Sequence, residues 1–432
     1  MHKVTINKLG PIAHVGLECR DFMVFTGAQA SGKSTIAKTI FFFRTVKDDI
    51  LSLIIKSALN AHVDKDTNLA GVFETGLKAK FIRVFGSLWE IDIDMSVEYQ
   101  FNENTYVKIR LNEETTHPSP NHVLIEFSDN IHKMIQNNSH IKYSTSIPDA
   151  EIIAIKKELN QLFSDPFDSV YIPAGRSLIT LLATQLNYIY STMEDAQKRA
   201  IDYCTRSYLE RILKIRPEFE NGLQGLLIDN PAKAHQQKDT LDLANGLITA
   251  ILKGSYSYHS GDERLELDHS RYVKINFISS GQQEVVWFLN LFFYHLLQNQ
   301  PTFFIIEEPE SNLFPESQKA VSEFIAFIKN AGNCMLVTTH SPYILGSLNN
   351  LLYPANIPPK AWEEAEKVID RRFWINRKTF NALFVQDGGI ISGMDDELMI
   401  IDNEKIDEIS GVINNEYDRL FEIRINSEKA GE

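Results

Sequence analysis

The chain has 432 residues, which at about 150 residues per domain allows two or three structural units. Its composition, 44% hydrophobic and 23% charged residues, excludes a disordered or collagen-like chain. Its 43 basic and 57 acidic residues give a net charge of −14, so any nucleic acid must bind a local patch rather than the whole surface.

Three strands are expected near the N-terminus, at residues 4–7, 12–17 and 22–25. A helical pattern then runs from Ser34 to about Asp48. Alternating apolar and polar residues between Phe81 and Leu111 predict antiparallel strands. The polar residues 112–147 predict an irregular segment with one helix at most.

A strand ending in a loop is expected at residues 170–176, and helical periodicity then continues to about Lys253. The expected elements after it are β structure at 265–277, helices at 282–297 and 317–329, and strands at 303–306 and 335–338. Alternating apolar strands and helices are typical of a parallel α/β sheet. We therefore predict an α/β fold with a mixed sheet core, an antiparallel β subdomain and an inserted helical lobe. The predicted boundaries are 1–174, 175–270 and 271–432.

The sequence also indicates where the protein resides. No stretch approaches the roughly 18 uncharged apolar residues of a membrane span, and no signal-peptide pattern opens the chain. The cysteines Cys19, Cys204 and Cys334 lie far apart and show no C-x-x-C spacing, which predicts reduced thiols. We expect a cytoplasmic protein without a membrane partner.

A phosphate-binding pattern, G-x-x-x-x-G-K-S/T, lies between the third strand and the first helix. Its residues are Gly27, Ala28, Gln29, Ala30, Ser31, Gly32, Lys33, Ser34 and Thr35. The glycines let backbone N–H groups curl around the β- and γ-phosphates, and the helix N-terminus adds positive charge. Lys33 neutralises the phosphates and Ser34 holds Mg²⁺. The motif therefore predicts an ATP site.

Two carboxylates, Glu307 and Glu308, end the strand at 303–306, which is the Walker B arrangement. Glu307 is expected to reach Mg²⁺ through water, and Glu308 to polarise the attacking water as general base. After the next strand, His340 is expected to donate to the γ-phosphate or to that water. Glu308 and His340 are thus the predicted catalytic residues.

A Ser-Gly turn opens the helix that precedes the Walker B strand. Its residues are Ser279, Ser280, Gly281, Gln282 and Gln283. The turn resembles the L-S-G-G-Q signature of ABC-class ATPases and offers a hydroxyl, N–H groups and a positive dipole end to an anion. Because the chain's own P-loop is already occupied, the expected anion is the γ-phosphate held by a second subunit.

The order of these four motifs resembles the ABC-class ATPases, and further segments are similar to its soluble SMC/RecF/OLD-like branch of AAA-family ATP-binding proteins. These segments are Gly10 to Ile12, Tyr171 to Arg176, Ser279 to Glu284, Glu307 to Pro315 and Thr339 to Pro342. The resemblance covers nearly the whole chain. It implies a P-loop NTPase fold of ABC/SMC-like type, ATP and Mg²⁺ as cofactors, and a homodimer or higher homo-oligomer.

In such a dimer two ATP molecules lie between the copies. Each site combines the P-loop, Glu308 and His340 of one copy with Ser280 and Gly281 of the other. Arg176 lies where a Q-loop would fall but where the glutamine is missing, and it is the candidate substitute for that sensor.

Three functions stay open. Chains of this length and motif style resemble ATPase components of bacterial anti-phage systems, which control a separate effector such as a nuclease. A RecF-like repair ATPase would bind DNA through a basic surface. A basic cluster flanks Phe373 and Trp374 and suits nucleic acid or a partner's acidic face, although a helix face that balances nearby acids is the better explanation: Lys367, Arg371, Arg372, Arg377 and Lys378. An OLD-like nuclease would need its own metal site. The chain after His340 has no D-x-D, while Glu90, Asp92 and Asp94, or the segment from Asp402 to Lys405, are better explained as solvated charges.

Overall fold

The computed structural model describes residues 2–59, 68–86, 92–112, 122–138, 143, 146–181, 202–259, 261–268, 271–395, 397–398, 400–402, 411 and 414–423.

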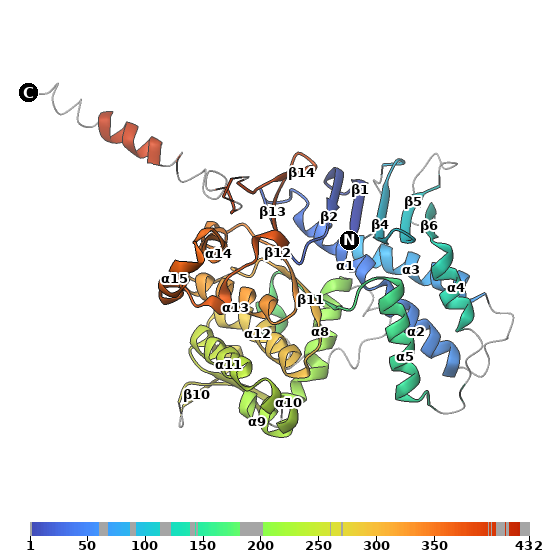
Figure 1. Cartoon of the computed structure of the whole chain (residues 1–432), viewed down its shortest axis with the longest axis horizontal. Helices are drawn as coiled ribbons and strands as arrows, with labels where there is room; N and C mark the ends of the chain where they lie inside the picture. The colour runs from blue at the N-terminus through green and yellow to red at the C-terminus, as the bar shows by residue number, and fades with distance from the viewer. Residues whose placement is uncertain are drawn as a thin grey trace, which may run out of the picture.

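A six-stranded mixed sheet forms the centre of the molecule (Figure 1). Its strands are β3 (Phe22–Thr26), β7 (Asp168–Ile172), β11 (Thr302–Glu307), β12 (Cys334–Thr338), β13 (Phe380–Gln386) and β14 (Gly389–Ser392). They follow the order β14-β13-β3-β12-β11-β7. All neighbours pair in parallel except β14, which is antiparallel to β13. The carboxyl ends of five strands therefore meet at one edge.

Successive side chains of the parallel strands enter two different hydrophobic cores, because strand side chains alternate between the faces of a sheet. In β3, Phe22 and Val24 pack in one core, and Met23 and Phe25 pack in the other. Every residue of β3, β11 and β12 is buried. This explains why these strands read as continuous apolar runs.

A five-stranded antiparallel sheet lies on one side of the mixed sheet, with helices α3 and α4 beside it (Figure 1). Its order is β2-β1-β4-β5-β6. The strands are β1 (Lys3–Leu9), β2 (Ile12–Glu18), β4 (Ser96–Asn102), β5 (Thr105–Leu111) and β6 (Val123–Phe127). The helices of this part are α1 (Lys33–Arg44), α2 (Val46–Leu59), α3 (Leu69–Phe85), α4 (Asp129–Asn137) and α5 (Asp149–Leu162).

The other core is covered mainly by helices, with α9, α10 and α11 gathered at the bottom of Figure 1. The helices of this part of the chain are α8 (Tyr203–Ile215), α9 (Gly222–Asp229), α10 (Pro231–Gln236), α11 (Lys238–Leu252), α12 (Ser280–Gln298), α13 (Pro315–Asn330), α14 (Pro342–Leu352) and α15 (Trp362–Val368). A small antiparallel sheet joins α11 to α12, with strands β8 (Ser255–His259), β9 (Asp262–Glu266) and β10 (Tyr272–Lys274). Short 3₁₀ turns lie at Arg216–Phe219, Ile275–Phe277, Tyr353–Asn356, Pro359–Ala361, Arg371–Phe373 and Arg377–Thr379.

The predicted fold class is confirmed: a mixed α/β sheet, an antiparallel β part and a helical part are all present. The predicted boundaries at residues 174 and 270 stay a prediction. Among the described residues, no helix combines the length and the apolar composition that a membrane crossing requires.

Three local predictions were wrong. The helix expected to run to Asp48 ends at Arg44, and α2 starts at Val46. Phe81 belongs to α3 rather than to a strand, since Phe73, Leu77 and Phe81 recur at helical spacing and are all buried. The same predicted strand segment also fails at Asp92, which lies at a turn where it and Asp94 form ion pairs with Lys8; Glu90 lies outside the described residues.

The third wrong prediction concerns residues 112–147, which contain strand β6 as well as helix α4. In β6, Val123, Ile125 and Phe127 are buried while the residues between them are not, so the alternation of a half-buried strand is present. The polar composition of the flanking residues obscured this pattern.

Candidate nucleotide site

Three of the four sequence motifs meet at the carboxyl edge of the mixed sheet, together with Arg176. The P-loop follows β3, Glu307 ends β11, His340 follows β12, and Arg176 lies just beyond β7. Backbone hydrogen bonds continue past the strands: Glu308 N donates to Thr338 O at 2.8 Å. The parallel pairing of β3, β12, β11 and β7 thus brings the P-loop and His340 to one edge, although they are more than 300 positions apart in the sequence.

The P-loop has a tightly restricted backbone. Gly27 and Gly32 have φ values of 138° and 110°, which favour glycine, and Ala30 adopts a left-handed φ of 60°. A Cβ on Gly27 would lie 2.3 Å from the Val385 carbonyl oxygen in β13, and a Cβ on Gly32 would lie 2.4 Å from Ile12 Cδ1 in β2. The loop is therefore enclosed by two strands and allows no side chain at these positions.

Helix α1 begins at Lys33 with Gly32 as its N-cap, and no side chain caps its first N–H groups. Free N–H groups and the helix dipole favour an anion at this end. Lys33 Nζ lies over the same loop and donates to the carbonyls of Gly27 (2.9 Å) and Ala28 (2.8 Å). Burial lowers the pKa of the Lys33 ammonium, while the carboxylates of Glu308 and Glu310 oppose that change.

Glu307 provides an observation on whether the site fits a divalent metal. Its side chain is buried; one carboxylate oxygen accepts from Ala174 N at 3.2 Å, and the other has no hydrogen-bond partner among the described residues. A buried carboxylate oxygen without a partner is costly, whereas Mg²⁺ prefers oxygen ligands. Ser34, which is exposed at the start of α1, supplies a hydroxyl as a second oxygen ligand. These two oxygens therefore fit Mg²⁺. Among the described residues, no group of three or more His, Cys, Asp or Glu side chains could hold a metal by itself.

Glu308 and His340 face one another. His340 Nε2 lies 3.5 Å from Glu308 Oε1, and Ser311 Oγ donates to the other carboxylate oxygen at 3.3 Å. The His340 side chain is 36% exposed and the Glu308 side chain is 40% exposed, so that water can reach both. Glu308 has a left-handed φ of 44°, and strained backbone of this kind in a non-glycine residue is common at functional sites.

Glu310 positions the histidine loop, a role that sequence reasoning missed. One of its carboxylate oxygens accepts from Thr339 Oγ1 and from His340 N, both at 2.7 Å. Its spacing of two residues from Glu308 was visible in the sequence, but the loop that it contacts is 29 residues away and only the fold brings it there.

The predicted signature residues divide into an exposed and a structural group. Ser279 and Ser280 are exposed at the N-terminus of α12. Ser279 and Gln282 form a capping box, and Gln282 also donates to Leu252 O at 2.7 Å. Gln283 is buried and donates to a backbone carbonyl. The two glutamines therefore hold the turn, and the serines are the residues presented to solvent.

Gly281 packs directly against the loop that follows Walker B, because a Cβ there would lie 2.7 Å from Asn312 O. The next helical residues continue this contact: Glu284 Oε1 accepts from Asn312 Nδ2 at 3.3 Å. The signature turn and the loop containing Asn312 thus form one packed unit.

Arg176 is fully buried and joins that unit to the carboxylates. Its guanidinium donates to the carbonyls of Pro173 (2.8 Å), Glu307 (2.6 Å), Glu308 (2.9 Å) and Glu284 (2.9 Å). Its backbone N–H donates to the Glu284 carboxylate at 3.0 Å. This geometry favours a positioning role for Arg176 over direct contact with phosphate.

The basic cluster near Trp374 is partly engaged within the chain. Arg371 lies over the rings of Trp362 (4.7 Å) and Trp374 (5.8 Å), and Arg372 pairs with Asp370. These contacts explain the mixture of basic and aromatic residues without nucleic acid, whose binding stays a prediction. Of the segment from Asp402 to Lys405, which was interpreted as a charged loop, residues 403–405 lie outside the described residues.

Comparison with known proteins places residues 1–345 in one family model, the AAA ATPase domain. Three solved structures resemble the chain at low identity. The SMC head bound to the C-winged helix domain of ScpA is 12% identical, with 90% of this chain and 96% of that chain covered and a TM-score of 0.42. The SMC head domain with an extended coiled coil, bound to the C-terminal domain of ScpA from Pyrococcus furiosus, is 13% identical, with 96% of this chain and 100% of that chain covered and a TM-score of 0.39. The SMC head domain from Thermotoga maritima is 12% identical, with 90% of this chain and 97% of that chain covered and a TM-score of 0.36. Among curated proteins no match is found.

Proposed function

The chain belongs to the AAA ATPase domain family, and from this membership we propose that it binds ATP with Mg²⁺ and hydrolyses the nucleotide between two copies of itself. The observation that carries the proposal is the meeting of the P-loop, Glu307, Glu308 and His340 at one sheet edge.

The first half of the proposed site lies within one chain. The N–H groups at the start of α1 and Lys33 hold the β- and γ-phosphates, while Ser34 and the unpartnered oxygen of Glu307 hold Mg²⁺. When bound, the metal neutralises phosphate charge. Glu308 accepts a proton from water, and His340 beside it donates to the γ-phosphate or to that water.

The second half is proposed to come from a second copy. The N-terminus of α12 is exposed, and besides the Ser279–Gln282 capping box it presents the Ser280 hydroxyl and the positive end of the helix dipole to an anion. Two large aromatic side chains are exposed near it in the chain or across the Gly281–Asn312 contact: Phe277 is 79% exposed and Phe314, two residues after Asn312, is 75% exposed. Since Gly281 contacts Asn312, these two aromatic residues flank one surface. An exposed apolar patch around an anion-binding turn supports a docking surface for another copy.

Substitution of both aromatic residues, Phe277→Ser with Phe314→Ser, is expected to weaken ATP-dependent dimerisation about tenfold or more, because interface aromatics carry much of the binding energy. Light scattering with Mg-ATP measures the dimer. A control, Ile228→Ser with Val368→Ser, removes side chains that are 75% and 82% exposed on α9 and α15. Equal dimerisation of both double variants would contradict this surface.

Dilution tests the proposed function as a whole. A P-loop site without a completing group from another copy turns over at only roughly 10⁻⁴ to 10⁻² per second, so the ATPase rate per chain should rise with protein concentration. Lys33→Ala is expected to abolish nucleotide binding, measured by calorimetry. A rate per chain that is the same in dilute and concentrated protein would show that one copy suffices.

We further propose that dimer closure controls a separate effector protein, as in an anti-phage system. Support comes from the order of the P-loop, Ser-Gly turn, Walker B strand and His340, which resembles that of ATPase components of such systems. Affinity purification with the products of adjacent genes tests this, and the expected result is one stable partner that is released or retained according to nucleotide. Salt-dependent binding of DNA to the purified dimer would instead favour a RecF-like function.

A further inference from the structure

A cavity lies at the edge of the mixed sheet opposite the candidate nucleotide site, where the parallel strands begin. It has a volume of about 410 Å³ and is bordered by residues at the amino ends of four parallel strands: Asp21 before β3, Phe303 in β11, Cys334 in β12 and Thr379 before β13. The nucleotide site described above uses the carboxyl ends of these strands. The cavity is therefore a separate place in the fold.

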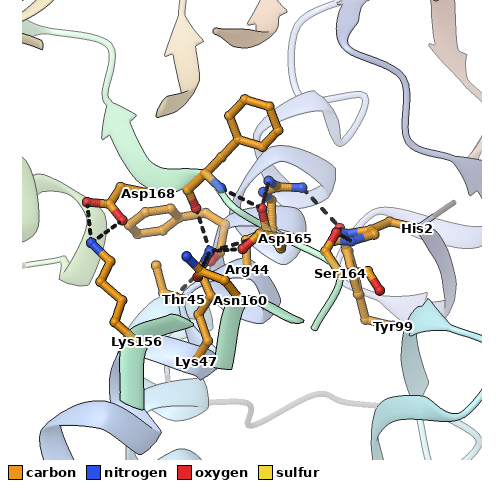
Figure 2. Close-up of polar contacts among 12 residues, drawn as sticks. His2, Arg44, Thr45, Lys47, Tyr99, Lys156, Asn160, Ser164, Asp165 and Asp168 are labelled. Atoms are coloured by element: carbon orange, nitrogen blue, oxygen red, sulfur yellow. Dashed lines mark hydrogen bonds and ion pairs between the residues drawn. The ribbon is translucent and has the colours of Figure 1, made fainter. Parts of the chain in front are cut away.

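A network of buried charged groups lies beside this cavity (Figure 2). Arg44 and Lys47, with side chains 6% and 3% exposed, share one buried carboxylate, Asp165. Arg44 donates to Asp165 Oδ1 at 2.6 Å, and Lys47 Nζ lies 3.5 Å from Oδ2. Lys47 also lies near the acids Asp48 and Asp168, so its charge is balanced away from the cavity. The cavity lining itself holds three cations, Arg20, Arg44 and Lys378, against two acids, Asp21 and Asp165, and therefore has a surplus positive charge.

Arg44 also has an unsatisfied donor. Its Nε is buried and has no hydrogen-bond partner among the described residues, while the guanidinium carbon lies 4.0 Å from the centroid of the Phe303 ring. Arg44 lines the cavity, and its terminal nitrogens contact Asp165 and His2 Nδ1 (3.5 Å), so an anion placed there competes with these partners for the planar group.

Further cations stand around the cavity. Arg20 and the exposed Lys378 line it, with Asp21 as the acid at this side. His2 adds no charge near neutral pH, since burial and the neighbouring Arg44 lower its pKa to about 4. Its ring nitrogens contact Tyr99 Oη (3.0 Å) and the Ser164 carbonyl (3.3 Å), as Figure 2 shows. The cavity thus combines a positive surplus with the apolar surface of Phe303 and Phe167.

We propose that this cavity binds a small organic anion, whose carboxylate or phosphate group is held by Arg44, Arg20 and Lys378 and whose carbon skeleton contacts Phe167. A volume of about 410 Å³ lies within the range of small-molecule sites. This site is additional to the proposed ATP site and does not depend on it.

The same helix connects the two sites. Helix α1 begins with the P-loop residue Lys33 and ends with Arg44; nine of its 12 residues are buried. A length of about 18 Å follows from the helical rise. An anion that draws Arg44 from Asp165 therefore acts on the helix whose other end contacts nucleotide. Such coupling is reciprocal, so the anion is expected to change ADP affinity by about threefold or more.

Calorimetry on the full chain tests the site with three probes: inorganic phosphate, citrate and glycerol 3-phosphate. ADP binding is established first, and the probes are titrated into ADP-saturated protein so that the P-loop is occupied. At least one probe is expected to bind with a Kd of about 0.01–1 mM. Tighter binding of citrate than of the phosphates would identify a carboxylate ligand, and the reverse order a phosphate ester.

A pair of double variants separates this site from general attraction of anions. Arg20→Ser with Lys378→Ser should raise the Kd about tenfold or more, whereas Arg372→Ser with Lys367→Ser removes the same charge outside the cavity and should leave it unchanged. Arg44→Lys keeps the charge but loses the planar fork and should also weaken binding. Absence of binding by all three probes at about 10 mM, or equal weakening in both double variants, would overturn the proposal. Binding without any change in ADP affinity would overturn the coupling alone.

Discussion

Glu308→Gln is expected to lower the rate of ATP hydrolysis by about 10²- to 10⁴-fold while ATP binding stays within about threefold, because an amide cannot accept the proton that a general base removes from water. The amide keeps the shape of the carboxylate and can still accept the hydrogen bond from Ser311 Oγ. ATP that is bound but not hydrolysed should hold the two copies together. An ATP-loaded dimer should therefore accumulate, detectable by light scattering after gel filtration.

The matched control for this substitution is Glu364→Gln, which removes the same charge from an exposed position on α15. It should leave both hydrolysis and the monomer–dimer distribution unchanged. A fully active Glu308→Gln variant would remove Glu308 as the base. Loss of ATP binding in this variant would instead show that the carboxylate contributes to the nucleotide pocket and not to the chemical step alone.

Arg176→Met should lower both stability and turnover. The substitution leaves buried carbonyls of Pro173, Glu307, Glu308 and Glu284 without their donor, and it leaves the buried Glu284 carboxylate without its cation. Breaking a buried ion pair in this way costs about 3–5 kcal/mol. Because the lost donors hold the backbone of both Walker B carboxylates, kcat should fall by about 10²-fold or more while KM changes little.

The chain offers a matched control for this effect. Arg216 and Glu263 form another buried Arg–Glu pair, 3.8 Å apart, against the small sheet of β8 and β9. Arg216→Met should cost comparable stability, measured by urea unfolding, and leave kcat of the folded protein unchanged. Arg176→Lys should recover part of kcat, since it restores charge but not the planar fork. Equal losses of kcat in both methionine variants would reduce Arg176 to a purely structural residue.

Much of the nucleotide site could be predicted because its signals are local. The P-loop requires glycines at fixed spacing, and the capping pattern of Ser279 and Gln282 marks the start of α12 within four residues. The apolar run before Glu307 indicates a strand buried on both faces, which the structure confirms. Helix α3 could also have been found in this way, since its buried residues recur at helical spacing, but the alternation after it was extended too far toward the N-terminus.

Other parts of the site depend on contacts between distant residues. Strand β13 was not predicted, although it pairs with β3 and its Val385 carbonyl encloses Gly27. The roles of Glu310, Glu284 and Arg176 likewise depend on partners 28 to 132 residues away. The spacing of residues along the chain does not predict contacts between residues so far apart.

The sequence by itself determined the class of chemistry, since phosphate-binding glycines, a lysine and strand-end carboxylates are required residue types at short, fixed spacings. Only the tertiary structure decided which polar groups are buried together: Arg176 on the Walker B carbonyls, Glu310 on the histidine loop, and Arg44 beside a cavity at the far end of α1. The physical reason is that burial and hydrogen-bond satisfaction are properties of the packed chain. A charged residue has the same letters in the sequence whether it ends in solvent or at the centre of a network.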